Sequence, residues 1–180
     1  MYGIINKSIQ ELVEHKFGVE VWLTIKKKSK IDIDFFLSNE PYDDEITYQL
    51  ASATAEELNI SVDAVLETFG EWWVMDTTQK KYPGMVKSGG KNLREFLINM
   101  PHFHNRVMLV YPKLSPPEFK VSEISDNGLN LHYFSHRPGL AAFVQGVIQG
   151  LSLLYETPVV TKLIKSRIEG DSHEIFNINW

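Results

Sequence analysis

The stretch PPEFKVSEISDNGLNLHYFSHRP, residues 116–138, is where the chain changes from helical to strand-like patterning. Apolar residues recur at every second position on either side of Asp126-Asn127-Gly128, a sequence typical of a hairpin turn. We therefore expect two antiparallel strands, the first from Phe119 to Ile124 and the second from Leu129 to Arg137.

Before this stretch the apolar residues follow the helical period of about 3.6 residues. Asp43, Ser61 and Asn92 each precede such a pattern, and all three are side chains that cap the first turn of a helix. The N-terminal half is therefore predicted to be helical.

After the hairpin, Pro138 opens an apolar helix that is expected to run to Leu154. A second hairpin is expected to turn at Glu169-Gly170-Asp171. Helices followed by four antiparallel strands predict an α+β fold.

The composition narrows the class of protein. The chain has 180 residues, the size of one domain, and 43% hydrophobic against 23% charged residues, which suits a buried core. A net charge of −5 argues against nucleic-acid binding. No apolar run reaches the roughly 18 residues that span a membrane, and Glu11 and Glu14 interrupt any secretory segment. We expect a cytoplasmic protein that binds neither nucleic acid nor membrane.

The chain has no cysteine, which excludes disulfides, zinc ribbons, iron–sulfur clusters and thiol nucleophiles. A chelating pair of histidines is hard to build locally: His102 and His104 face opposite sides of a helix, and His132 and His136 lie about 13 Å apart on a strand. A Ser135–His136 hydrolase site is disfavoured because neighbouring strand residues point to opposite faces.

His104 has apolar neighbours at helical spacing. The residues on its face are Leu97, Met100, Val107, Met108 and Tyr111. A histidine in this setting is either a satisfied core residue, which the pattern alone favours, or the single axial ligand of a haem packed against the apolar wall.

Tyr133, Ser135 and Arg137 share one face of the second strand at about 6.6 Å intervals. They are either a solvated strand face or a row of donors for the carboxylates of an amphipathic ligand. Gly146 and Gly150 interrupt the apolar helix at a cost of about 1 kcal/mol each relative to alanine, which indicates close approach by another backbone or by a flat ligand.

The chain resembles the H-NOX (haem–nitric oxide/oxygen binding) domains, relatives of the haem domain of soluble guanylate cyclase. The motifs that carry the resemblance span the whole chain: MYGIIN at 1–6, FGEWW at 69–73, HNRV at 104–107 with a proline pair ending thirteen residues after the histidine, LHYFSHR at 131–137 and GDSHEIFNI at 170–178. The resemblance implies a single domain in which a helical distal lobe, residues 1–60, packs on a proximal α+β lobe, residues 61–180, with haem b between them.

By this resemblance His104 is implied as the proximal iron ligand, and Pro117 as the proline that distorts the porphyrin. The other implied haem contacts are Leu97 and Met100 and, for the propionates, Tyr133, Ser135 and Arg137. An acid of the distal lobe is implied to pair with the arginine, with Asp43 as the nearest match and Asp44 as the competitor.

The distal gas pocket is implied to be lined by Ile5, Trp73, Ala142 and Gly146. Ala142 falls where oxygen-binding relatives place a tyrosine hydroxyl, which dioxygen needs far more than NO does. We therefore predict an NO sensor that rejects dioxygen. The indole N–H of Trp73 offers a substitute donor, although a packing role is favoured.

The resemblance also implies a non-enzymatic mechanism, in which NO weakens or breaks the bond between iron and His104 and the lobes shift about Arg137. Because the sequence ends at Trp180 without an output domain, we expect one of two situations. Either it signals to a separate histidine kinase or to a cyclic-di-GMP synthase or phosphodiesterase, or it is a fragment of a longer protein. The alternatives are an oxygen-binding haem sensor, a haem or small apolar ligand binding module and, least favoured, a hydrolase.

Overall fold

The computed structural model describes the backbone of residues 1–180 and every side chain except those of Pro83 and Val110. The elements in chain order are α1 (Gly3–Phe17), α2 (Val19–Lys28), α3 (Asp44–Leu58), α4 (Val62–Trp72), the π-helix η1 (Trp73–Thr78), α5 (Gln79–Lys81), α6 (Pro83–Lys87), α7 (Leu93–Val110), β1 (Glu118–Ser122), β2 (Gly128–Phe134), α8 (Ala141–Leu154), β3 (Val160–Lys165), the 3-10 turn η2 (Arg167–Glu169) and β4 (Glu174–Asn179). The predicted α+β class is confirmed.

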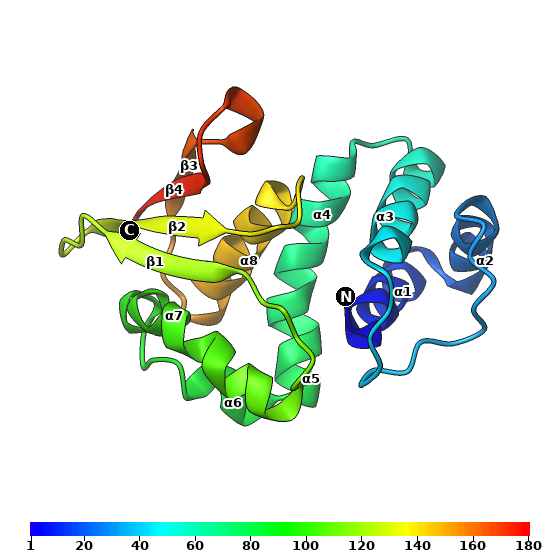
Figure 1. Cartoon of the computed structure of the whole chain (residues 1–180), viewed down its shortest axis with the longest axis horizontal. Helices are drawn as coiled ribbons and strands as arrows, with labels where there is room; N and C mark the ends of the chain where they lie inside the picture. Colours follow the sequence, from blue (N-terminus) through cyan, green and yellow to red (C-terminus); the bar gives the residue numbers. More distant parts are fainter.

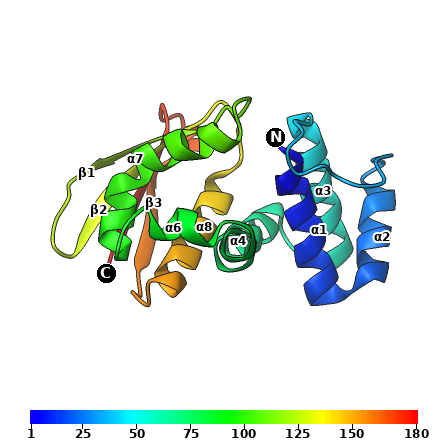
Figure 2. The ribbon, with the colours of Figure 1, turned by 90° about the horizontal axis from the view of Figure 1, so that it is seen from below.

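Helices α1, α2 and α3 stand together on one side of the molecule, and α4 and the later elements stand on the other (Figures 1 and 2). We call residues 1–60 the N-terminal lobe and residues 61–180 the C-terminal lobe, because the turn between α3 and α4 separates them. The apolar core of the N-terminal lobe buries Ile9, Trp22 and Leu50, and Phe69 of α4 is buried in the same cluster.

The helix starts follow the capping residues that the sequence predicts. Asp43 accepts a hydrogen bond from the backbone N–H of Glu45 at the start of α3, at 3.0 Å. Ser61 caps α4 and Asn92 caps α7 in the same way, through bonds of 3.1 and 2.8 Å to N–H groups three residues on. Each bond satisfies a donor that the helix itself leaves unpaired.

The sheet has the order β1-β2-β4-β3, with every neighbouring pair antiparallel. Alternation along β2 buries Leu129, Leu131 and Tyr133. The first two of these share one apolar core with Leu97 of α7 and Leu151 of α8. Helices α7 and α8 therefore cover the same face of the sheet.

Several predicted boundaries shift where loops leave the regular elements. Strand β1 ends at Ser122 rather than Ile124. Strand β2 ends at Phe134 rather than Arg137, because the carbonyl groups of Ser135 and Arg137 turn away to accept hydrogen bonds from the Arg167 guanidinium. Helix α8 begins at Ala141, three residues after the predicted start. This shortening leaves residues 135–140 as a loop beside the N-terminal lobe.

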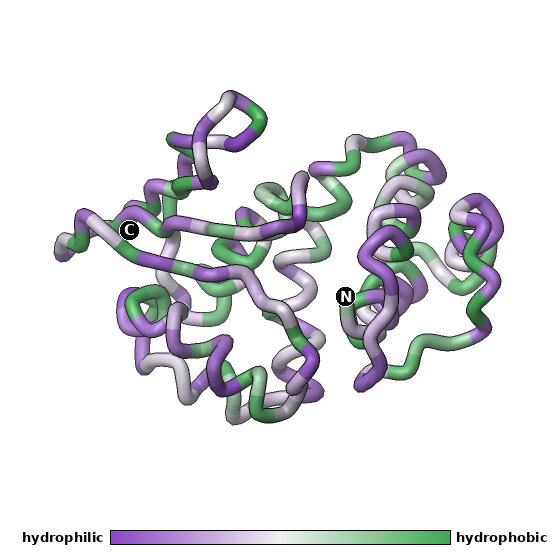
Figure 3. Tube along the Cα trace, viewed as in Figure 1, coloured by the Kyte–Doolittle hydropathy of each residue, from purple (hydrophilic) through white to green (hydrophobic). Residues whose placement is uncertain are grey.

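Hydrophilic and hydrophobic residues alternate along the helices, as purple and green segments show in Figure 3. Within the residues that the structure describes, no helix combines the length and the apolar character needed to cross a bilayer.

Candidate functional site

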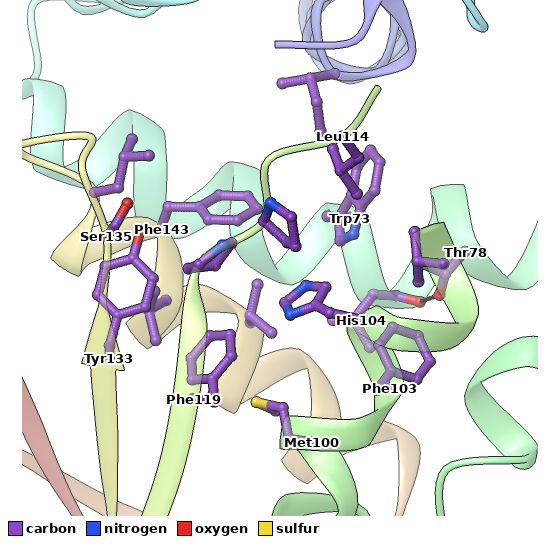
Figure 4. Close-up of a pocket in the computed structure, with 18 of the residues that line it drawn as sticks. Trp73, Thr78, Met100, Phe103, His104, Leu114, Phe119, Tyr133, Ser135 and Phe143 are labelled. Carbon is purple, nitrogen blue, oxygen red and sulfur yellow. Dashed lines mark hydrogen bonds between the residues drawn. The ribbon is translucent and has the colours of Figure 1, made fainter. Parts of the chain in front are cut away.

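One largely apolar cavity of about 270 Å³ lies between the two lobes and receives side chains from α1, η1, α7, β1, β2 and α8. The residues of the sequence-based site that line it are Ile5, Trp73, Met100, His104, Pro117, Tyr133, Ser135 and Arg137. Residues more than 130 positions apart in the chain thus meet at one place, shown in Figure 4.

His104 projects from α7 into the middle of this cavity (Figure 4). Burial lowers the pKa of its imidazole to about 4. Its ring stacks on Phe119 with centroids 5.6 Å apart and planes inclined by 19°. Within the part of the chain that the structure describes, the ring nitrogens make no hydrogen bond. A neutral imidazole with an uncommitted lone pair is the form that binds a metal ion.

The side chain of Arg137 lies at one end of the cavity and joins the two lobes. Its Nε donates to Asp44 Oδ2 at 2.7 Å, and its Nη1 donates to the carbonyl of Ser115 at 2.8 Å. Nη2 makes no hydrogen bond to a described residue, so donors remain for a carboxylate. Tyr133 and Ser135 line the same cavity, and burial raises the pKa of the Tyr133 hydroxyl.

The acid that pairs with Arg137 is Asp44, and the expectation of Asp43 is wrong. The Asp43 carboxylate is occupied as the cap of α3, whereas Asp44 lies in the first turn of that helix and also accepts a hydrogen bond from the Met1 ammonium. Burial pushes the pKa of Asp44 upward, but the hydrogen bonds from the Met1 ammonium and Arg137 outweigh it and leave the pKa below its ordinary value.

Arg167 holds the loop that carries Ser135 and Arg137, a role that the sequence did not indicate. Its Nε contacts both carboxylate oxygens of Glu174 at 2.9 Å, and its Nη2 donates to the carbonyl of Arg137 at 3.1 Å. Because Arg167 and Arg137 are thirty residues apart, no local pattern could have linked them.

Leu97 does not line the cavity, although the sequence-based prediction was that it contacts the ligand. It is fully buried in the core between α7, α8 and the sheet. Met100, one turn closer to His104, is the residue of this face that reaches the cavity.

The residues that α8 contributes to the cavity differ from the predicted ones. Ala142 packs instead against Ala51, Ala55, Val65 and Leu66 of α3 and α4. A Cβ atom on Gly146 would lie 1.9 Å from the Glu67 carbonyl oxygen, so this glycine allows α8 to touch the backbone of α4. The α8 residues that line the cavity are Phe143, Val144, Val147, Ile148 and Leu151.

The π-helix η1 places Trp73, Val74 and Thr78 on the cavity wall. The hydroxyl of Thr78 is occupied because it donates to the carbonyl of Val74 at 2.8 Å. The indole nitrogen of Trp73 points into the cavity in Figure 4 and makes no hydrogen bond to any residue that the structure describes. Single π turns within helices occur frequently at functional sites.

The hydroxyls of Tyr82 and Tyr111, which also line the cavity, hydrogen-bond to each other. Burial, followed by this hydrogen bond, raises the pKa of Tyr111. The sequence did not indicate this pair, since the two tyrosines lie on different elements.

The site therefore combines an apolar slot, one neutral imidazole and a cationic end with hydroxyl groups. Such a slot suits a flat apolar group with acidic tails and a central metal that takes one nitrogen ligand. Haem has these properties, and the residues that line the cavity fit it.

Comparisons with known proteins agree. The Haem-NO-binding family model matches residues 2–163. The chain is 30% identical over 176 residues to soluble guanylate cyclase gcy-34 of Caenorhabditis elegans, covering 96% of this chain and 26% of that protein. Soluble guanylate cyclase 89Da of Drosophila melanogaster is 26% identical over 146 residues, which are 81% of this chain and 22% of that protein. The chain thus spans about a quarter of the length of these relatives.

Solved structures share the fold along the whole chain. An unliganded Fe(II) H-NOX protein from K. algicida superposes with a TM-score of 0.83 at 26% identity, over 99% of this chain and 96% of that one. An H-NOX protein from S. oneidensis in the Fe(II)NO state superposes with a TM-score of 0.90 at 19% identity, over 99% and 98% of the two chains. The chain belongs to the Haem-NO-binding (H-NOX) family of haem-binding gas sensor domains.

Proposed function

We propose that this chain is an NO sensor that holds haem b through His104, rejects dioxygen and signals to a separate protein. The observation that carries the proposal is the position of His104. It is the one histidine that lines the cavity among the described residues, it is kept neutral by burial, and it has no competing hydrogen bond there.

Haem bound here would be held by His104 and would supply a ferrous iron that binds NO. Phe119 fixes the plane of the imidazole by stacking. Arg137, Tyr133 and Ser135 would bind the propionates, and the ring of Pro117 would press on the porphyrin from the loop before β1.

The proposed rejection of dioxygen depends on the side of the cavity that α8 forms. Dioxygen draws more electron density from iron than NO does, so it depends more on a nearby hydrogen-bond donor. The α8 residues on the cavity are all apolar, and Phe143 stands on this face in place of the predicted Ala142. Phe143, like the predicted Ala142, offers no hydroxyl to bound dioxygen.

The Arg137–Asp44 pair would transmit the change, because it connects the loop after β2 to the start of α3 across the lobe boundary. Burial would keep the His104 imidazole neutral even where it does not hold the haem, and α7, which carries this residue, is the element through which the change would reach the pair. A ligand shifts such an equilibrium only by its unequal affinity for the two states.

An oxygen-binding haem sensor is the second candidate, and Trp73 is the observation that favours it. Its indole N–H points into the cavity without a described acceptor (Figure 4). An N–H in this position could donate to a bound gas molecule.

Absorption spectra of the ferrous, haem-loaded chain separate the candidates. We expect the spectrum to change when NO is added without air, and to show only slow oxidation when the NO-free protein is exposed to air. A new and stable spectrum in air would favour the oxygen sensor. Purification without haem from haem-sufficient cells would overturn both candidates.

For the output we propose a partner protein, with a histidine kinase or a cyclic-di-GMP synthase or phosphodiesterase as the candidates. The support is the family relationship, since H-NOX domains bind NO and signal to partner proteins. The cytoplasmic location stays a prediction.

A further inference from the structure

Two histidines meet on the face of the sheet that points away from the haem cavity. His132 lies on β2 between Leu131 and Tyr133, which line the cavity, so its side chain projects to the opposite face. His173 directly precedes β4, the strand next to β2. From the sequence, only His136 could be compared with His132 as a neighbour on the same strand face, because His173 is 41 residues away.

The two imidazoles belong to a chain of hydrogen bonds that ends in a serine on each side. His132 Nδ1 lies 2.9 Å from His173 Nε2. Ser122 Oγ lies 2.7 Å from His132 Nε2, and Ser172 Oγ lies 2.7 Å from His173 Nδ1. Each ring thus has one nitrogen facing the other ring and one facing a hydroxyl.

We propose that His132 and His173 form a site for a divalent transition-metal ion, with Cu²⁺ preferred, bound by His132 Nδ1 and His173 Nε2. The site is separate from the cavity that contains His104.

The hydroxyl partners make this arrangement suitable for a metal. A hydroxyl can donate or accept, so both serines can accept the N–H of the outer ring nitrogen. In that pair of tautomers the two inner nitrogens carry lone pairs and face each other, and no proton has to leave. A hydrogen bond from the outer nitrogen is also what orients histidines that bind metals in proteins.

The inner nitrogens point almost straight at each other, because they lie 2.9 Å apart while the ring centroids lie 5.1 Å apart. A metal ion about 2.05 Å from both nitrogens would lie to the side of the line that joins them, so each ring has to rotate toward it. Among the divalent first-row metals, Cu²⁺ binds most tightly to a given set of nitrogen ligands.

The surroundings hold the rings in place and favour the neutral form of His132. Phe134 stacks on His173 with centroids 4.0 Å apart. Burial, and then the charge of His173, lowers the pKa of His132, which favours the neutral imidazole. The nearby cation of Lys120 lies over the ring of Phe134, at 5.1 Å from its centroid, and pairs with Glu118 at 3.1 Å.

No third protein ligand is present, since no group of three or more His, Cys, Asp or Glu side chains gathers anywhere in the described part of the chain. Water would fill the remaining positions. An open site of this kind exchanges its metal, unlike a closed structural site.

The test is a calorimetric titration of the haem-loaded chain with Cu²⁺, Ni²⁺ and Zn²⁺ in separate runs, with electron paramagnetic resonance of the copper. We expect one equivalent of Cu²⁺ with nitrogen hyperfine structure, bound more tightly than Ni²⁺ or Zn²⁺. His132→Gln and His173→Gln should each abolish this binding of Cu²⁺. His136→Gln, which changes an exposed histidine in the loop after β2, should retain it.

The Ser122→Ala and Ser172→Ala variants keep both ligands and should weaken binding about tenfold each, as loss of an orienting partner does. These serine variants also test the metal site if the histidine variants do not fold. Equal copper binding by the wild type and the His132→Gln/His173→Gln double variant would overturn the proposal, and so would unchanged binding in both serine variants. The iron absorption bands report separately on the haem, so this failure is distinguishable from failure of the proposed sensor.

Discussion

The two walls of the haem cavity differ in how their sequence relates to their structure. The wall formed by α7 and the sheet carries His104, the proposed ligand, and Tyr133 at positions that follow from a regular helix and strand, and Arg137 lies in the loop directly after β2. The wall formed by η1 and α8 depends on a π-helix and on a close crossing of α4 and α8.

Polar binding residues can thus be located from local periodicity, whereas the residues that line an apolar gas pocket depend on how whole helices pack. The first wall is expected to bind haem, and the second to select the gas. Substitutions on the two walls should therefore affect different measurements.

The largest expected effect belongs to His104. The folded pKa of about 4 lies below the ordinary value of 6.5, so the unfolded chain takes up more protons between these values. The contribution to stability is complete above about pH 6.5 and is lost as the pH falls toward 4, by about 3 kcal/mol. Urea unfolding of the haem-free chain at several pH values measures this. His104→Gln should remove that part of the slope and His102→Gln should not. An unchanged slope in His104→Gln would show that the imidazole is not buried.

Gly146→Ala tests the packing account of the second wall. Its new Cβ would meet the Glu67 backbone, so we expect a loss of about 1–3 kcal/mol in the free energy of unfolding. Gly84→Ala is the matched control, because its Cβ would have no neighbour within 4 Å. A normal stability with an altered gas affinity in Gly146→Ala would restore the pocket role that the sequence suggested.

Phe143→Tyr tests which α8 residue faces the gas. The added hydroxyl should stabilise bound dioxygen by about 1.5 kcal/mol, roughly a tenfold gain in affinity over the wild type. Ala142→Ser adds a hydroxyl one position away, on the side that packs against α3 and α4, and should leave oxygen affinity unchanged. Oxygen titrations followed by absorbance compare the variants, and a gain in Ala142→Ser alone would reverse the assignment.

The smallest expected effect concerns the link between the lobes. Asp44→Asn should cost about 1 kcal/mol, since the pair with Arg137 is partly exposed. Asp43→Asn should cost little, because asparagine caps helices as well as aspartate does. The Asp44 contribution should also disappear as the pH falls below about 4, because its folded pKa is lowered. Chemical denaturation of both variants checks this, and a larger loss in Asp43→Asn would contradict the pairing seen here.

Much of the fold could be predicted from the sequence. The capping residues located the helix starts, and the change to a period of two located the sheet. The site residues on regular elements followed from the same periodicity and from the family motifs. The choice of Asp44 over Asp43 could not be predicted, because it depends on which of two adjacent acids the helix cap occupies.

The α8 assignments were wrong for a related reason. A helix that is apolar on most sides gives little sign of which face meets a cavity, and consecutive residues differ by about 100°. The structure shows that Gly146 meets α4 and that Ala142 packs against α3 and α4, whereas Phe143 packs against these helices and also lines the cavity. The contact between His132 and His173 likewise depends on strand order, which spacing along one strand does not contain.

The most direct test of the account is the haem content of His104→Gly with and without imidazole. We predict that the variant purifies with little haem, and that imidazole added during expression restores both the haem and the ferrous absorption spectrum. Wild-type haem content and spectrum in His104→Gly without imidazole would contradict the assignment of His104 as the iron ligand.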